Sequence, residues 1–122
     1  MSELEEYQAI VSKLLDRTAE GKVSWQVHPF KAGFTASLRE SSTSFFEFML
    51  LVTGPSTDRT ISLTTSDELG HELFNVVSTV FPTSAAEEKL SESLEKLYDA
   101  ARRQALKIPE KIKVVSDLLD RA

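Results

Sequence analysis

The chain has no cysteine and only two histidines, His28 and His71, among its 122 residues. The lack of cysteine excludes disulfides and thiolate nucleophiles, and it is typical of proteins from a reducing compartment. The two histidines form no helical pair, so the residue types that bind zinc most readily are scarce and scattered. We therefore expect no metal site and no cofactor.

Long hydrophobic runs and an excess of basic charge are also missing. The longest apolar run, residues 48–52, is far too short to span a bilayer, and residues 1–6 are acidic and lack the regions of a secretory signal. The net charge of −5 disfavours non-specific attraction to nucleic acid or anionic lipid. The sequence thus predicts a single domain over residues 1–122, located in the cytoplasm and without membrane association.

Catalytic and phosphate-binding motifs are absent from the sequence. The four glycines stand alone, and neither a dinucleotide-binding fingerprint nor a P-loop occurs. Serine and threonine are abundant, but no nucleophile-elbow motif is present, and these residues fall in turns or at alternating positions. Residues of this kind are typical of strands with solvent-facing hydroxyls, so we expect a protein that is not an enzyme.

Apolar residues at helical spacing are present at the N-terminal end of the chain. A stripe that runs from Leu4 to Leu15 follows a capping-box pattern formed by Ser2 and Glu5. Gly21 stands where a C-terminal glycine cap is expected. This pattern predicts an amphipathic helix over residues 3–20.

The C-terminal part also has helical spacing, in two segments. Ser84 and Glu87 match a second capping box before a long apolar stripe that ends at Leu106. Pro109 cannot continue that helix, but it fits the first turn of a final one. The stripe of this last helix consists of Ile112, Val115, Leu118 and Leu119.

Between these helices, residues 25–66 alternate apolar and polar side chains in several runs separated by polar turns. Runs begin at Trp25 and Phe34, and two more cover residues 44–53 and 60–65. Short turns at 40–44 and 54–58 favour an antiparallel meander. The run 44–53 is apolar on both faces, which indicates a central strand.

Residues 67–81 fit two interpretations. Leu69, Leu73 and Phe74 have helical spacing, and we favour a helix here. However, Gly70 weakens a helix by about 1 kcal/mol relative to alanine, and residues 75–81 are rich in strand-forming side chains. A turn at 68–70 that leads into a fifth strand is the alternative.

The predicted fold class is α+β. An antiparallel meander of four or five strands is packed on one face by the N-terminal helix and the two C-terminal helices.

The second face of the predicted sheet is the candidate functional surface. Hydroxyl residues line it on the flanking strands, and apolar side chains occupy the central strand, as in a weak interface or a homodimer contact. The alternative is that residues 67–81 or the final helix cover it. The candidate interface consists of Phe45, Met49, Leu51, Thr35, Ser37, Thr60, Ser62 and Thr64.

The leading hypothesis is therefore a non-catalytic, cytoplasmic interaction or accessory module. Its partner would be another protein or a second copy of the chain, bound through this face or an edge strand. The alternative is a nucleic-acid- or anion-binding regulator that uses a basic cluster. Acidic residues are interspersed there and no aromatic platform accompanies it, which disfavours nucleic acid. The cluster contains Arg102, Arg103, Lys107, Lys111 and Lys113.

The segment L-Y-D-A-A-R-R-Q-A-L over residues 97–106, followed by the stripe of the last helix, resembles small uncharacterised bacterial proteins. These have an N-terminal helix, a strand set that begins with tryptophan, and a closing helix of the form L-Y-x-x-A-R-R-x-A-L. Trp25 after Gly21 and Lys22 fits that scheme. The resemblance implies no known function, but it favours a turn and a strand at 68–77. Residues 107–109 depart from the looser connection expected, which leaves the geometry of the last helix open.

Overall fold

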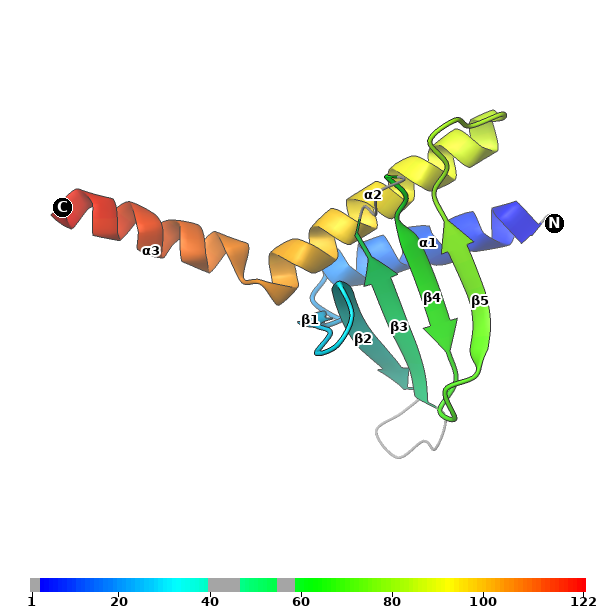
Figure 1. Cartoon of the computed structure of the whole chain (residues 1–122), viewed down its shortest axis with the longest axis horizontal. Helices are drawn as coiled ribbons and strands as arrows, with labels where there is room; N and C mark the ends of the chain where they lie inside the picture. Colours follow the sequence, from blue (N-terminus) through cyan, green and yellow to red (C-terminus); the bar gives the residue numbers. More distant parts are fainter. Residues whose placement is uncertain (1–2, 40–46, 55–58) are drawn as a thin grey trace.

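The computed structural model describes residues 3–39, 47–54 and 59–122. These residues form three helices and five strands around one hydrophobic core (Figure 1). In chain order the elements are α1 (Glu3–Ala19), β1 (Gln26–Val27), β2 (Gly33–Arg39), β3 (Glu47–Thr53), β4 (Ser62–Ser66), β5 (Glu72–Val77), α2 (Ala85–Ala105) and α3 (Ile108–Arg121).

The five strands form one antiparallel sheet in the order β1-β2-β3-β4-β5, so each strand pairs with its neighbour in sequence. Leu50 at the centre of β3 lies opposite Ala36 of β2 and Thr65 of β4. The predicted α+β class and the meander are confirmed, and β3 is the central strand.

One face of the sheet contributes to the core. Alternate residues of the strands, among them Phe34, Leu50 and Leu63, are buried against α1 and α2, which lie across this face in Figure 1. Leu94 and Leu97 of α2 are completely buried. The apolar stripes predicted for these two helices therefore pack where the sequence places them.

The helix favoured for residues 67–81 is wrong, and the alternative fifth strand is confirmed. Asp67 Oδ1 accepts hydrogen bonds from the backbone N–H groups of Leu69 and His71, at 2.9 and 2.8 Å, which closes a turn. Gly70 has a φ of +85°, a left-handed conformation that ends any helix here. The chain then enters β5, which pairs with β4 through a β-bulge between Thr65 and Ser66.

The start of α2 confirms part of the predicted capping box. Ser84 Oγ accepts a hydrogen bond from the Glu87 backbone N–H at 3.1 Å, as an N-cap residue should. The Glu87 carboxylate accepts hydrogen bonds from the backbone N–H and the hydroxyl of Thr83, and these hold the pKa of Glu87 below its usual value of 4.5. The other predicted capping box includes Ser2, which lies outside the described residues.

The position of α3 corrects the prediction that both C-terminal helices pack on the sheet. The helix begins with Pro109 in its first turn, as predicted, but it projects away from the domain as a separate arm (Figure 1). None of its residues is buried. The change of direction occurs at Lys107, whose φ of 53° is left-handed and which lies between α2 and α3.

Candidate functional site

No helix or strand in the described part of the chain covers the outer face of the sheet, opposite α1 and α2 (Figure 1). Neither element proposed to cover it does so, because residues 72–77 form a strand of the sheet and α3 projects away from it. Met49 is 40% exposed and Leu51 is partly exposed at the centre of this face.

The strand register brings most of the predicted interface residues together. Leu51 lies between Thr35 of β2 and Thr64 of β4, and Met49 lies opposite Ser37. Of the other two described residues, Ser62 is the first residue of β4, and Thr60 lies two residues before that strand. Phe45 lies outside the described residues.

The hydroxyl groups on this face are largely engaged within the sheet. Thr35 Oγ1 donates to the Leu50 carbonyl at 3.0 Å, and Thr64 Oγ1 donates to Asn75 Oδ1 at 3.2 Å. The face therefore offers apolar contact around Met49 and Leu51 and weak hydrogen bonding at its margins.

The basic cluster lies at the junction of α2 and α3. Arg103 lines a cavity of about 710 Å³ there together with Asp99, Lys96 and Glu110. The two acids balance the two bases, and no aromatic side chain is among the described residues that line this cavity. The other four residues lie nearby: Arg102 in α2, Lys107 between the helices, and Lys111 and Lys113 on α3. Anion binding at this junction stays the alternative prediction.

Both histidines make contacts within local turns. His28 Nδ1 accepts hydrogen bonds from the backbone N–H groups of Phe30 and Lys31, each at 3.0 Å. The His71 ring lies 3.3 Å from the Asp67 carboxylate, and hydrogen bonds from the backbone of His71 hold the pKa of Asp67 below its usual value. Within the described ranges, no three histidine, aspartate or glutamate side chains gather as a metal site would require.

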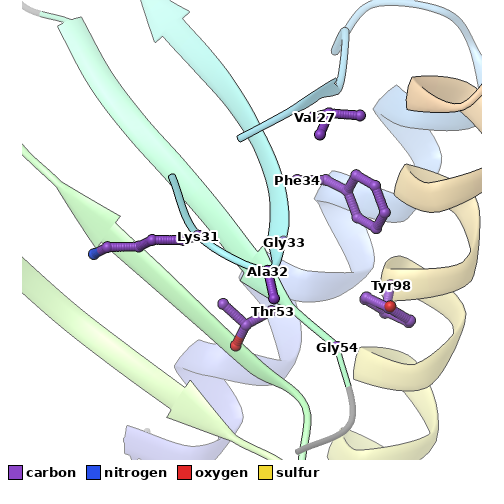
Figure 2. Close-up of a pocket in the computed structure, with 8 residues that line it drawn as sticks. All are labelled: Val27, Lys31, Ala32, Gly33, Phe34, Thr53, Gly54 and Tyr98. Carbon is purple, nitrogen blue, oxygen red and sulfur yellow. The ribbon is translucent and has the colours of Figure 1, made fainter. Parts of the chain in front are cut away.

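A cavity of about 540 Å³ lies at the end of the sheet where β2 and β3 approach α2 (Figure 2). Phe34 and Tyr98 form an aromatic wall, with ring centroids 5.7 Å apart. The Lys31 amine extends away from this wall in Figure 2. Gly54 is in close contact with the Tyr98 side chain, and an added Cβ would overlap it. No carboxylate or histidine is among the described lining residues, so they provide packing and no acid–base pair.

Two apolar surfaces remain whose exposure the sequence did not predict. The first is the stripe of α3, defined as Ile112, Val115, Leu118 and Leu119, which are 58, 55, 57 and 69% exposed. The sequence predicted this stripe but placed it in the core, because periodicity identifies the apolar face of a helix and not what covers it. The one sequence feature that pointed to a different position was the connection at residues 107–109, which departs from the looser connection expected from the resemblance.

The second surface is a groove of about 470 Å³ on the inner face of the sheet, beside α1. Ile10 and Leu14 of α1 form one wall, and Lys13 and Arg17 of the same helix also line it. Apolar side chains of the sheet form the floor, namely Leu38, Phe48, Leu50, Leu73 and Phe74. This surface is hereafter called the α1 groove.

No protein-family model matches the chain, and no curated protein and no solved structure matches it either. No helix in the described part of the chain is both long and apolar enough to cross a membrane.

Proposed function

We propose that this chain is a cytoplasmic, non-catalytic protein-interaction module that binds its partner through the stripe of α3. The observation that carries the proposal is the exposure of four aliphatic side chains in one line on a helix with no buried residue. Recognition of an amphipathic helix by an apolar groove is a common mode of protein binding, and it uses anchors at this helical spacing.

The length of α3 supports this proposal. Isolated helices shorter than about 12 to 15 residues are marginal in water, and most helices in proteins are stabilised by packing of an apolar face. With 14 residues, α3 is at this limit. It has an N-cap residue, Lys107, that makes no side-chain capping bond. A partner that covers the stripe would supply the missing stabilisation.

The energy available from the stripe indicates the strength of the contact. Complete burial of one aliphatic side chain contributes about 1.5–3 kcal/mol. Since these four side chains are a little more than half exposed, covering them contributes roughly 3–7 kcal/mol. Association itself costs about 4–15 kcal/mol. One stripe alone therefore supports weak binding, and a stable complex needs further contacts.

The outer face of the sheet is the natural source of a second contact. Its central side chains, Met49 and Leu51, are accessible, and the hydroxyl rim fits the polar margin of an interface. It exposes fewer large apolar side chains than α3, and therefore we assign the main binding role to α3.

Site-specific photocrosslinking tests this function. A photoreactive residue that replaces Val115 should give covalent protein adducts in cells that express the chain. The matched control carries the same residue in place of Asp117, which α3 places about 160° further around its axis. The proposal expects adducts from position 115 and few from position 117. Equal labelling at both positions, or none at either, would refute it.

A further inference from the structure

The α1 groove and the stripe of α3 are two uncovered apolar surfaces of the same chain. We propose that the groove is the binding site for α3 of a second copy, and that two copies exchange this helix reciprocally. This inference rests on the proposed function, because it identifies the partner that the stripe binds.

The position of the groove leaves room for a third helix on the sheet. Gln8 of α1 donates a hydrogen bond to Ser93 of α2 at 3.0 Å, so these two helices are direct neighbours. None of the described residues that line the groove belongs to α2. Since α1 supplies one wall and the sheet supplies the floor, α1 lies between α2 and the groove (Figure 1).

The chain's own α3 is too closely tethered to fill this position. Only Leu106 and Lys107 separate α2 from α3, and a connection of two residues spans about 7 to 11 Å. Packed helices lie about 8–10 Å apart, so a helix on the far side of α1 is roughly 16–20 Å from α2. In the structure α3 projects away from the sheet instead (Figure 1). A second copy carries the same helix without this constraint.

Charges on α3 and on the groove are complementary in one orientation. Asp120 lies on one side of the stripe, about 80° around the helix axis from Ile112, with Lys113 and Asp117 next to it. Lys111, in contrast, lies within the arc of the stripe, between Leu118 and Val115. The α1 wall of the groove presents Lys13 and Arg17. Arg17 already pairs with Glu20, whereas Lys13 has no ion pair with any other described residue. Seating the Asp120 flank against α1 would pair opposite charges and keep Lys111 away from them.

The area available matches a weak, concentration-dependent dimer. Complete burial of an aliphatic side chain removes roughly 60–120 Å² of apolar surface from water. Four stripe side chains, a little more than half exposed, give roughly 130–290 Å² for each helix. The groove exposes less apolar area than the upper end of this range, so two stripes and two grooves give an apolar total of roughly 500–850 Å². Polar flanks add to this sum, which stays below the roughly 1,200 Å² at which stable specific interfaces begin and within the range of weak, transient ones.

Reciprocal exchange also closes the assembly. When each copy donates α3 and receives α3, the two contacts are related by a two-fold axis, and no stripe or groove is left open. One-way donation would leave an open groove at one end and would continue into longer chains.

Light scattering on the purified full chain, combined with size-exclusion chromatography over a wide concentration range, tests the inference. We expect a concentration-dependent mass of twice 13.6 kDa. Ile112→Asp in the stripe and Leu73→Asp in the groove should each yield monomers. Lys113→Asp introduces the same residue next to Ile112 but outside the stripe and beside Asp120, and it should not weaken the dimer.

Mixing provides the decisive positive result. The Ile112→Asp chain keeps an intact groove, and the Leu73→Asp chain keeps an intact α3, so an equimolar mixture should form a heterodimer through one intact contact, at a higher concentration than the wild-type dimer requires. If Leu73→Asp fails to fold, a pair of charge-reversing substitutions at Lys13 and Asp120 replaces it. Lys13→Asp should weaken the dimer at least several-fold, and addition of Asp120→Lys should restore it.

Four results would overturn the inference. They are a wild-type monomer at every concentration, a dimer that survives both Ile112→Asp and the groove variant, open oligomers larger than a dimer, and a charge exchange that restores nothing. A wild-type monomer that still gives stripe-specific crosslinks to a different protein would refute self-exchange and leave the proposed function standing. Absence of any stripe-specific crosslink would refute both.

Discussion

Two leucine-to-alanine substitutions should have very different effects on stability. Leu94 of α2 is completely buried in the core, whereas Leu118 of α3 is 57% exposed. Truncating a fully buried leucine to alanine costs about 2–5 kcal/mol, because the transfer free energy of the removed atoms is lost and a cavity is left behind. Substitutions on an exposed surface are usually within about 0.5 kcal/mol. We therefore expect Leu94→Ala to lower the free energy of unfolding by at least about 2 kcal/mol and Leu118→Ala to leave it nearly unchanged in dilute solution.

Urea unfolding at low protein concentration measures both effects, since a shift in midpoint at constant slope reports a change in stability. The comparison uses the same chemical change in two helices, so differences in helix propensity cancel. At high protein concentration the Leu118→Ala chain should become less stable than wild type, because a dimer that uses the stripe would stabilise the folded state by mass action. A loss of about 2 kcal/mol or more for Leu118→Ala in dilute solution would refute the reasoning, because it would mean that α3 packs within its own chain.

Three further predictions concern the rest of the molecule. Gly54→Ala should destabilise the fold by about 1–3 kcal/mol in thermal or urea unfolding, because the new Cβ would overlap Tyr98 and force a shift of packed atoms; an unchanged midpoint would contradict this. The carboxyl pKa of Glu87 should lie below 4.5 by NMR titration, and Thr83→Val should raise it; because the folded-state pKa is lowered, this contribution to stability is present above about pH 4.5 and is lost as the pH falls through the folded-state pKa. Titration with DNA or RNA at low salt should show no binding, because acids accompany the bases at the α2–α3 junction; binding with a steep salt dependence would support the alternative function.

The sheet could be predicted because its signals are local. Alternation along β2 and β3 places Phe34, Ala36 and Leu50 on one face and Thr35 and Leu51 on the other, and the structure shows the same division. Short polar turns then restrict the strands to a meander. The candidate surface on the outer face follows directly from this alternation, since a strand that buries one face must present the other.

The fifth strand was harder to predict, because Leu69, Leu73 and Phe74 are compatible with both periods. The choice depends on partners outside the segment. Asp67 closes the turn, and β4 offers an unpaired edge with which the following residues hydrogen bond. Pairing with a strand edge is a tertiary effect that a local hydrophobic pattern does not contain.

The position of α3 could not be predicted for a related reason. Its stripe indicates a helix with one apolar face, which the structure confirms, but the direction of the helix depends on the backbone at Lys107. A left-handed residue followed by Pro109 turns α3 away from the sheet. The α1 groove was equally hidden, because it arises where side chains from α1 and four strands leave an uncovered region.

Hydrogen exchange in α3 tests the central claim most directly. An uncovered 14-residue helix opens readily, whereas a helix seated in a groove protects its backbone N–H groups. We expect the amides of residues 112–119 to exchange slowly in a concentrated solution of the purified chain and much faster on dilution. Ile112→Asp should make them exchange rapidly at every concentration. Rapid exchange of these amides in the concentrated wild-type chain would contradict the claim that α3 binds a second copy.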